Sequence, residues 1–459
     1  MNQRETGDLG QGSVGKLLLR LALPTITAQL VNALYNMVDR IYIGHIPVVG
    51  RTALTGVGVC MSLIMIISAF AALTAMGGAT RASIFLGRGD RAGAEKILGN
   101  CVTGAVSAGL ILTVVFLIFS RPLLMAFGAS EETIGYAVQY MKIYALGTVF
   151  VELALGLNAF ITAQGFASVA MVSVLIGAVA NMILDAVLIL GLGMGVAGAA
   201  LATIISQGLS ALWVVRFLLG KKTGLRIRRE NLGLDWKLYG PCLALGLSPF
   251  IMQSTEGVIS VCFNASLQRY GGDLAVGAMT ILASVMQFSM LPLQGLTQGA
   301  QPIISYNFGA KNARRVKSAF RLLLICCLSY SALLWLLAMV FPGTLASIFA
   351  TDKTLISYSA WAMRIYMAAS VIFGAQIACQ QTFIALGNAK TSLFLAVLRK
   401  IILLIPLILI LPLLFRRGEE KAMAVFLAEP VADTLAVLTT VCTFACQFRK
   451  TMKDLEETA

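Results

Sequence analysis

The chain has 459 residues, of which 58% are hydrophobic and 12% charged, with a mean hydropathy of +0.86. Soluble domains carry about twice that share of charge, so the composition excludes a soluble globular protein and indicates an all-α polytopic membrane protein. The net charge of +14 comes from basic connections between apolar stretches, where membrane topology accounts for it and no nucleic-acid partner is expected.

Apolar stretches that are long enough to cross a bilayer as helices, which takes roughly 20 residues, predict twelve spans. When basic residues of the spans, Arg399 and Lys400 included, are counted with the nearer connection, the side of both termini holds 25 of the 35 Lys and Arg residues. The positive-inside rule therefore predicts cytoplasmic termini in a multi-pass protein of the cell membrane. The predicted spans are 17–44, 53–80, 96–119, 136–160, 167–190, 196–219, 240–268, 276–303, 316–341, 355–386, 392–415 and 421–447.

The first span carries a polar stripe along one helical face, because its polar residues recur at steps of three and four. An ionised carboxylate is expensive in lipid, so the stripe and Asp39 are expected to face a bundle interior or a wet cavity. The alternative places Asp39 at the membrane edge, paired with Arg40. Pro24 removes one backbone hydrogen bond, and we expect it to act as a hinge. The stripe consists of Thr25, Gln29, Asn32, Asn36 and Asp39.

The fifth span contains a second intramembrane acid, since Asn181 and Asp185 lie one turn apart in an apolar context. Asp185 has no cation within a turn, so it must be neutral, solvated or paired with another helix. Two carboxylates brought together at low dielectric cannot both stay ionised: one takes a proton or they share a metal cation. Asp39 and Asp185 therefore predict a site that binds a cation, with Na⁺ among the candidates, or carries a proton.

The longest polar interruption, residues 220–237, divides the chain into two sets of six spans. A shift of 222 residues superposes the turn at 77–96 on the turn at 299–318, which indicates a weak internal repeat. An even number of spans gives both halves the same orientation, with ligand expected at their interface. The predicted domains are an N-lobe over 1–225 and a C-lobe over 226–459.

The seventh span repeats the pattern of the first, with a polar face that includes Gln253 and Glu256 opposite the helix-1 stripe. We expect the polar residues of the central helices to bind substrate, although single glutamines in such helices also commonly form interhelical hydrogen bonds. His45 is the only histidine, and no cofactor is expected. The candidate substrate residues are Gln29, Asn32, Asn36, Gln253, Glu256 and Gln287.

Several segments resemble the multidrug and toxic compound extrusion (MATE) exporters: LALPTITAQLVNALYNMVDRIYIG (21–44), NAFITAQGFAS (158–168), NMILDAVLILGLGMGVAGAALAT (181–203) and SYNFGAKNARRV (305–316). The resemblance extends over essentially the whole chain. It implies twelve helices in two six-helix lobes around a V-shaped cleft. It also implies export of amphipathic, often cationic, drugs against inward flow of H⁺ or Na⁺, and we expect a monomer in contact with membrane lipid.

The resemblance also implies where the coupling ion binds. One branch of the family has an N-lobe site, and its pattern is matched here by six residues, with Pro24 at the position of the helix-1 hinge. Another branch has a C-lobe site, of which Glu256 matches the helix-7 acid while Ala375 or Gln376 stands where an acid would be. This departure favours the N-lobe site and leaves Glu256 as a candidate for binding cationic drug. The N-lobe residues are Asp39, Asp185, Asn181, Thr203, Asn158 and Tyr140.

Two other functions compete with drug export. A lipid-linked oligosaccharide flippase of related architecture is expected to line its cleft with Arg or Lys for pyrophosphate, whereas the inward residues here are acids and amides. An embedded enzyme is disfavoured, because the sequence has no HExxH, Gly-x-Ser-x-Gly or His-rich site to carry chemistry. The choice between H⁺ and Na⁺ is not decided by the sequence.

Overall fold

The computed structural model describes residues 9–46 and 49–457, which are almost entirely helical. The first half contains α1 (Val14–Gly44), α2 (Gly50–Ala71), η1 (Ala72–Met76), α3 (Gly77–Gly87), α4 (Arg91–Ala126), α5 (Ile134–Leu146), α6 (Thr148–Ala163), α7 (Ala167–Asp185), η2 (Ala186–Gly191) and α8 (Gly195–Leu219). After η3 (Arg229–Asn231), the second half contains α9 (Trp236–Gly309), α10 (Ala313–Val340), α11 (Pro342–Ser347), α12 (Lys353–Tyr366), α13 (Ser370–Ala385), α14 (Ala389–Val397), η4 (Leu398–Leu404), α15 (Ile405–Ile410), η5 (Leu411–Leu414) and α16 (Gly418–Glu457).

These elements amount to the twelve predicted spans, so the predicted fold class is confirmed. Within the described residues, nine helices are long and apolar enough to cross a membrane, and two bent pairs raise the number to eleven. The twelfth is found within α9, where two antiparallel spans meet at Gly272, with φ 63° and ψ −162°. That positive φ is readily available only to glycine. The bent pairs are α5–α6, at 59°, and α12–α13, at 52°.

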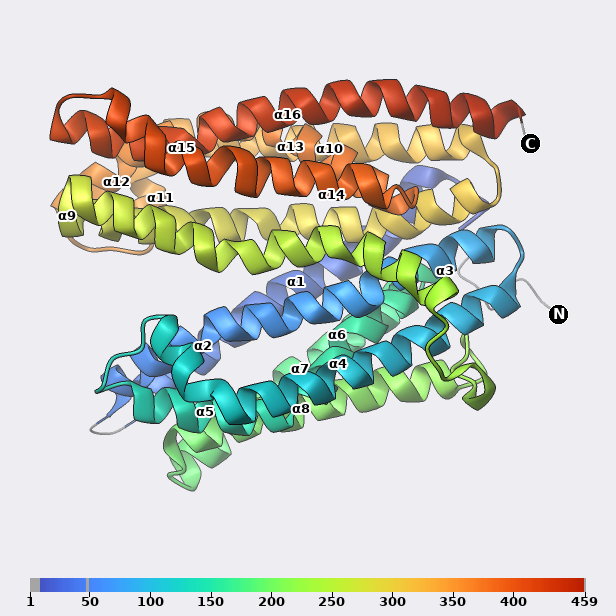
Figure 1. The fold of residues 1–459 in the computed structure, drawn as a ribbon, viewed down its shortest axis with the longest axis horizontal. Helices are drawn as coiled ribbons and strands as arrows, with labels where there is room; N and C mark the ends of the chain where they lie inside the picture. Colours follow the sequence, from blue (N-terminus) through green and yellow to red (C-terminus); the bar gives the residue numbers. More distant parts are fainter. Residues whose placement is uncertain (1–8, 47–48, 458–459) are drawn as a thin grey trace.

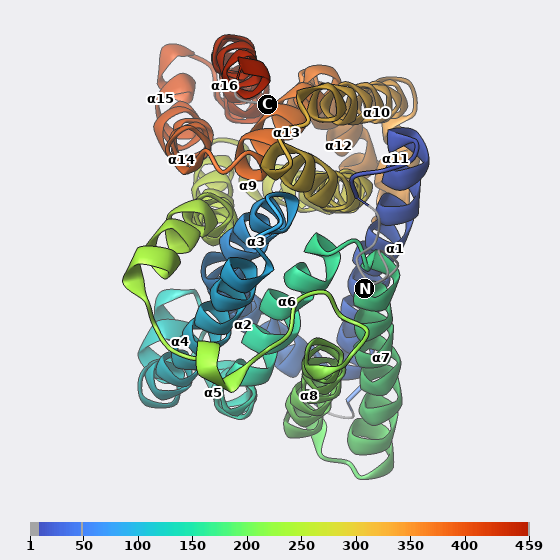
Figure 2. The ribbon, with the colours of Figure 1, turned by 90° about the vertical axis from the view of Figure 1, so that its right-hand side faces the viewer.

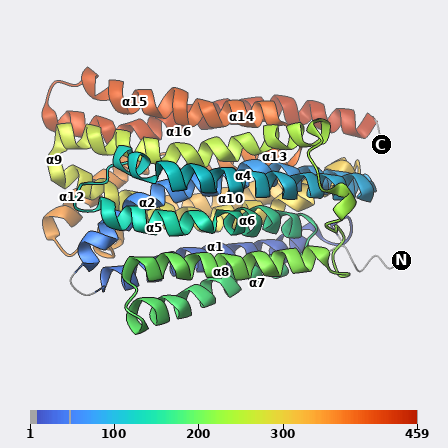
Figure 3. The ribbon, with the colours of Figure 1, turned by 60° about the horizontal axis from the view of Figure 1, so that its bottom comes forward.

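The helices form two bundles that lie side by side. Figure 1 shows α1–α8 as one bundle and α9–α16 as the other, with both ends of the chain at the same end of the molecule. Seen end-on, α7 and α8 lie farthest from α15 and α16, while α1, α3 and α9 lie between them (Figure 2). The helices run roughly parallel to one long axis (Figure 3), as expected for membrane spans.

The bundles meet at the end that carries the termini. A methyl group added at Gly77 would overlap the Cys242 carbonyl oxygen, and one added at Gly87 would overlap the Tyr306 carbonyl oxygen. Small residues permit such close backbone approach between helices. The Thr25 hydroxyl of α1 also donates to the Gly295 carbonyl of α9 at 2.6 Å. Toward the opposite end the two bundles diverge (Figure 1).

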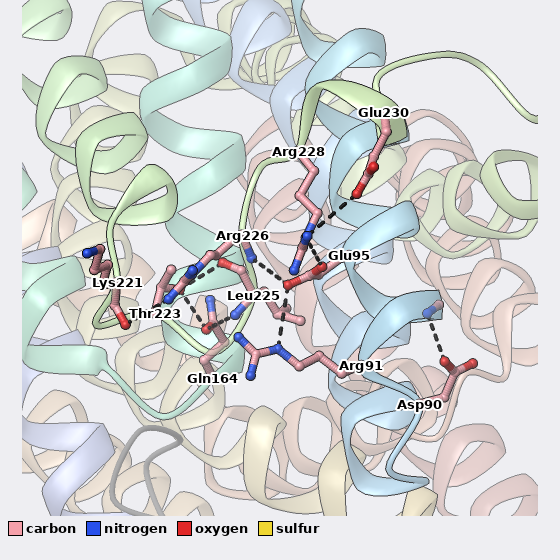
Figure 4. Close-up of polar contacts among 11 residues, drawn as sticks. Asp90, Arg91, Glu95, Gln164, Lys221, Thr223, Leu225, Arg226, Arg228 and Glu230 are labelled. Atoms are coloured by element: carbon pink, nitrogen blue, oxygen red, sulfur yellow. Dashed lines mark hydrogen bonds and ion pairs between the residues drawn. The ribbon is translucent and has the colours of Figure 1, made fainter. Parts of the chain in front are cut away.

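The segment between the bundles is attached to the first of them. Glu95 of α4, which is buried, accepts hydrogen bonds from Arg228 Nε at 2.6 Å and from the Arg226 backbone N–H at 3.3 Å. Gln164 Oε1 accepts from the Thr223 hydroxyl and the Leu225 N–H, as Figure 4 shows. Basic residues of this connection thus have partners within the protein, and contacts to α4 continue as far as Asp235, beyond the predicted lobe boundary at 225.

Three π-helical segments interrupt the spans, each beside a buried ionisable side chain. In η1, the Thr74 hydroxyl donates to Glu152 at 3.3 Å. Segment η2 begins directly after Asp185, and η4 contains Arg399 and Lys400. Because π-bulges widen a helix locally and are frequent at functional sites, these three positions are candidates for functional sites.

Candidate functional site

The two intramembrane acids of the first bundle meet. Asp39 of α1 is 4% exposed and Asp185 of α7 is 0% exposed, and their carboxyl groups lie within hydrogen-bonding reach of each other. Among the described residues, Oδ1 of Asp39 and both carboxyl oxygens of Asp185 find no hydrogen-bond donor. Arg40 is exposed, so Asp39 is turned into the bundle and away from the membrane-edge environment of the alternative interpretation.

Amide and hydroxyl groups surround a small cavity in the same bundle. Asn158, Asn181 and Thr203 line it together with Tyr35 and Gln207, and its volume is about 40 Å³. A cavity of this size that is partly lined by polar groups has room for a water molecule or a small ion. Oδ1 of Asn158 and both polar side-chain atoms of Asn181 are buried without a partner in the described part of the chain.

Tyr140 connects this cavity to the acid pair. Its side chain is 1% exposed, its hydroxyl contacts Thr203, and it lies within electrostatic reach of Asp39. The structure therefore gathers all six predicted coupling residues in one bundle, although Asp39 and Asp185 themselves do not line the cavity.

Neither acid of this pair has an ion-pair partner among the described residues. Buried carboxylates without donors are costly, and two in contact take up a proton or share a cation. Hard cations prefer oxygen ligands, and the unpartnered oxygens of Asn158 and Asn181 are of that kind. No group of three or more His, Cys, Asp or Glu residues that could hold a metal occurs within 9–46 and 49–457, so Na⁺ would need these neutral oxygens.

The candidate substrate residues are dispersed by comparison. Gln29 Nε2 donates to Gln298 Oε1 of α9 at 3.1 Å, which ties the two bundles together. Asn36 donates to the Asn32 carbonyl one turn back, and Asn32 lines the small cavity. Gln287 is exposed and Gln253 is half-buried. Their role in binding substrate stays a prediction.

Pro24 lies inside an unbroken α1. On either side of it, Ala22 and Ile26 contact Gly299 and Gly295 of α9 so closely that an added methyl group would come within 2.7 Å and 2.5 Å of their backbone. The proposed bend would therefore have to occur where α1 is packed against the other bundle.

The second bundle contains an ion-pair cluster that sequence reasoning missed. Lys400 Nζ lies 2.5 Å from Glu256 Oε1. Arg399 Nε lies 2.7 Å from Asp433 Oδ1, and Arg399 Nη2 lies 3.0 Å from Glu429 Oε1. The guanidinium also stacks over the Phe373 ring, 4.6 Å from its centre.

The Glu256 carboxylate is therefore paired with Lys400, and its role in binding cationic drug stays a prediction. The topology count placed Arg399 and Lys400 with the cytoplasmic connections, whereas the structure buries both in η4. A signal was present: two adjacent basic residues occur inside an apolar stretch, and two acids one turn apart follow in the next span.

Comparison with known proteins finds one matching family model and similar multidrug export proteins. The family model described as MatE matches residues 24–187 and 249–410. The multidrug export protein MepA of Staphylococcus haemolyticus (strain JCSC1435) is 25% identical over 438 residues, covering 95% of this chain and 93% of the relative. MepA of Staphylococcus aureus (strain N315) is 24% identical, covering 88% of each chain.

Solved structures agree with this. The MATE multidrug transporter DinF-BH, in a ligand complex, has a TM-score of 0.89 and 33% identity, covering 98% of this chain and 99% of its own. An outward-facing multidrug resistance MATE family transporter of the MOP superfamily also has a TM-score of 0.89, at 20% identity and 99% coverage of each chain; that match concerns the fold alone.

Proposed function

The chain belongs to the MatE family of multidrug efflux transporters, and from that premise we propose that it is a secondary active antiporter that exports amphipathic cationic compounds in exchange for H⁺ or Na⁺. The observation that carries the antiport proposal is the contact between Asp39 and Asp185, two buried carboxyl groups without donors in the described residues. We place the protein in the cell membrane as a monomer.

The proposed cycle starts from the arrangement seen in the structure. If the basic connections mark the cytoplasm, both termini are cytoplasmic, the bundles are closed on that side and diverge toward the outside. Asp39 and Asp185 take the coupling ion from outside, with Asn158, Asn181 and Thr203 supplying oxygens. Neutralising the pair removes the charge that favours hydration of this region.

The coupling follows from which state each ligand favours. A neutralised pair allows α1 to bend at Pro24 and close the bundle, which displaces drug outward before the bundles rock to release the ion inside. The coupling can be no larger than the difference in affinity of each ligand for the two states. One inward charge supplies roughly 2.3 kcal/mol per 100 mV, which sustains a gradient of about 50-fold for an uncharged drug. Exchange of one ion for one monovalent cationic drug moves no net charge, so the concentration gradient of the ion alone drives it.

The test is transport by the full chain in liposomes, with ethidium as the drug and with sodium and pH gradients imposed separately. We expect one of the two gradients to drive ethidium movement and a protonophore to abolish it only in the proton case. Ethidium movement that responds to neither gradient would overturn the antiport proposal. The flippase alternative loses support, because the buried cations Arg399 and Lys400 are already paired with carboxylates.

A further inference from the structure

The ion-pair cluster of the second bundle has an unbalanced charge. It contains three acids, Glu256, Glu429 and Asp433, and two cations, Arg399 and Lys400. Arg399 pairs with both Glu429 and Asp433 and lies over the Phe373 ring. The acids outnumber the cations by one, and in these contacts among the described residues Lys400 is the cation that pairs with a single acid.

The pair that Lys400 forms is asymmetric in its exposure. The Lys400 side chain is 8% exposed and that of Glu256 is 51% exposed. On α9, Gly246 and Phe250 face the first bundle, through contacts to Leu73 and Phe70. Met252 faces inward and accepts from Gln380. Glu256 follows Met252 by one turn and is rotated toward the face of α9 that carries Gly246. The accessible Glu256 carboxylate is therefore paired with an ammonium that lies deeper in the second bundle.

A second acceptor for that ammonium already exists. Glu429 is 5% exposed, and its Oε2 has no hydrogen-bond partner in the part of the chain that the structure describes. Lys400 lies within electrostatic reach of Glu429. Arg399, the residue before Lys400, lies 3.0 Å from Glu429 Oε1, so an ammonium that leaves Glu256 stays beside a buried carboxyl group and avoids the large cost of an isolated buried charge.

We propose that the Lys400 ammonium is a tethered cation that occupies Glu256, and that organic cations bind the second bundle by displacing it toward Glu429. Lys400 then sets selectivity: a ligand must carry a positive charge to replace it, and a neutral amphiphile gains nothing at this position. The inference rests on the proposed function for its ligand class, but it concerns equilibrium binding and can be tested without transport.

The experiment measures binding of ethidium, and of the neutral dye Nile red, to the purified full-length protein in detergent. Removing the competing ammonium with Lys400→Met is expected to tighten ethidium binding about tenfold, as loss of a nearby like charge allows. Glu256→Gln is expected to weaken it about tenfold, and the double variant is expected to lose the gain. Nile red affinity is expected to stay the same throughout.

Glu429→Gln tests the second acceptor. It is expected to weaken ethidium binding severalfold when Lys400 is present and to have no effect in the Lys400→Met background, where no ammonium needs a new partner. Lys317→Met is the matched control, because it removes one positive charge from an exposed ion pair with Glu456 and is expected to leave ethidium affinity within twofold.

Ethidium affinity that is the same in Lys400→Met and wild type overturns the proposal, as does a gain that persists in the double variant. If Lys400→Met does not fold, Glu429→Gln in the natural background decides, and unchanged ethidium affinity there overturns it. Absence of binding to every variant also overturns it. Failure of the antiport proposal is a separate result, seen only as transport that ignores both ion gradients.

Discussion

The two bundles contain buried charge in opposite arrangements. In the first, Asp39 and Asp185 contact each other without a donor among the described residues. In the second, Arg399 and Lys400 are held by three carboxylates. A buried carboxyl pair without a cation must bind a proton or a metal ion from solution. The carboxylates of the second bundle are instead paired with Arg399 and Lys400 of the protein itself. The two halves of similar architecture therefore differ in whether their buried acids are paired with cations of the protein.

The largest effect on transport is expected when one acid of the first bundle is removed. Asp39→Asn or Asp185→Asn leaves a single carboxylate with a neutral amide, which can no longer exchange between a charged and a neutralised pair. Gradient-driven ethidium transport in liposomes is expected to fall to the background of protein-free vesicles, with normal membrane insertion. The control is Glu131→Gln, an acid that is 76% exposed. Transport that survives in both Asp variants would contradict the site.

The next effect concerns stability in the second bundle. Arg399→Met leaves Glu429 and Asp433 buried without their cation. Breaking a buried pair on one side costs about 3–5 kcal/mol, while replacing all its members by apolar residues is often neutral. Thermal unfolding in detergent is expected to show a strongly lowered midpoint for Arg399→Met and a largely restored one for Arg399→Met with Glu429→Met and Asp433→Leu. An unchanged midpoint in the single variant would show that the cluster does not need its cation.

These two regions also differ in how far the sequence could predict them. The spans follow from local hydropathy, and the stripe from Thr25 to Asp39 follows from helical spacing, so the bounds and the inward face of α1 were predictable. Asp39 and Asp185 were predicted to share a site because both are intramembrane acids of the same half, and the family resemblance matched both to one pattern. Helical spacing alone says nothing about which helices are neighbours.

The ion pairs of Arg399 and Lys400 escaped for a related reason. Basic residues near a span end are normally read as topology signals, and only tertiary packing shows that η4 places them beside α9 and α16. The π segments and the 59° bend at Gly147 likewise depend on packing: a side chain added at Gly147 would meet Ile204 of α8. Periodicity alone therefore predicts one continuous helix over 136–160.

A smaller effect, on the affinity for the coupling ion, is expected from a neutral residue of the first bundle. Asn181→Ala removes amide groups that line the small cavity and have no partner in the described chain. A hydrogen bond to a charged group contributes about 1.5–3 kcal/mol, so the apparent affinity for the coupling ion is expected to fall about tenfold or more, with transport retained at high ion concentration. Thr27→Ala is the control, since Thr27 is exposed and its hydroxyl donates to its own helix. Equal ion dependence in both variants would remove Asn181 from the site.

The smallest effect on stability is expected at an ion pair that is short but exposed to solvent. Lys317 and Glu456 lie 2.6 Å apart, as close as Arg399 and Asp433 at 2.7 Å, yet their side chains are 46% and 54% exposed, against 8% and 4% for the buried pair. Water solvates exposed ions whether or not they are paired, and salt screens them, so such pairs contribute about 0–1 kcal/mol. Glu456→Gln is expected to change the free energy of unfolding by no more than this amount, and by less at high salt. The thermal unfolding midpoint should therefore shift only slightly. A loss as large as that of Arg399→Met would mean that burial does not distinguish the two clusters.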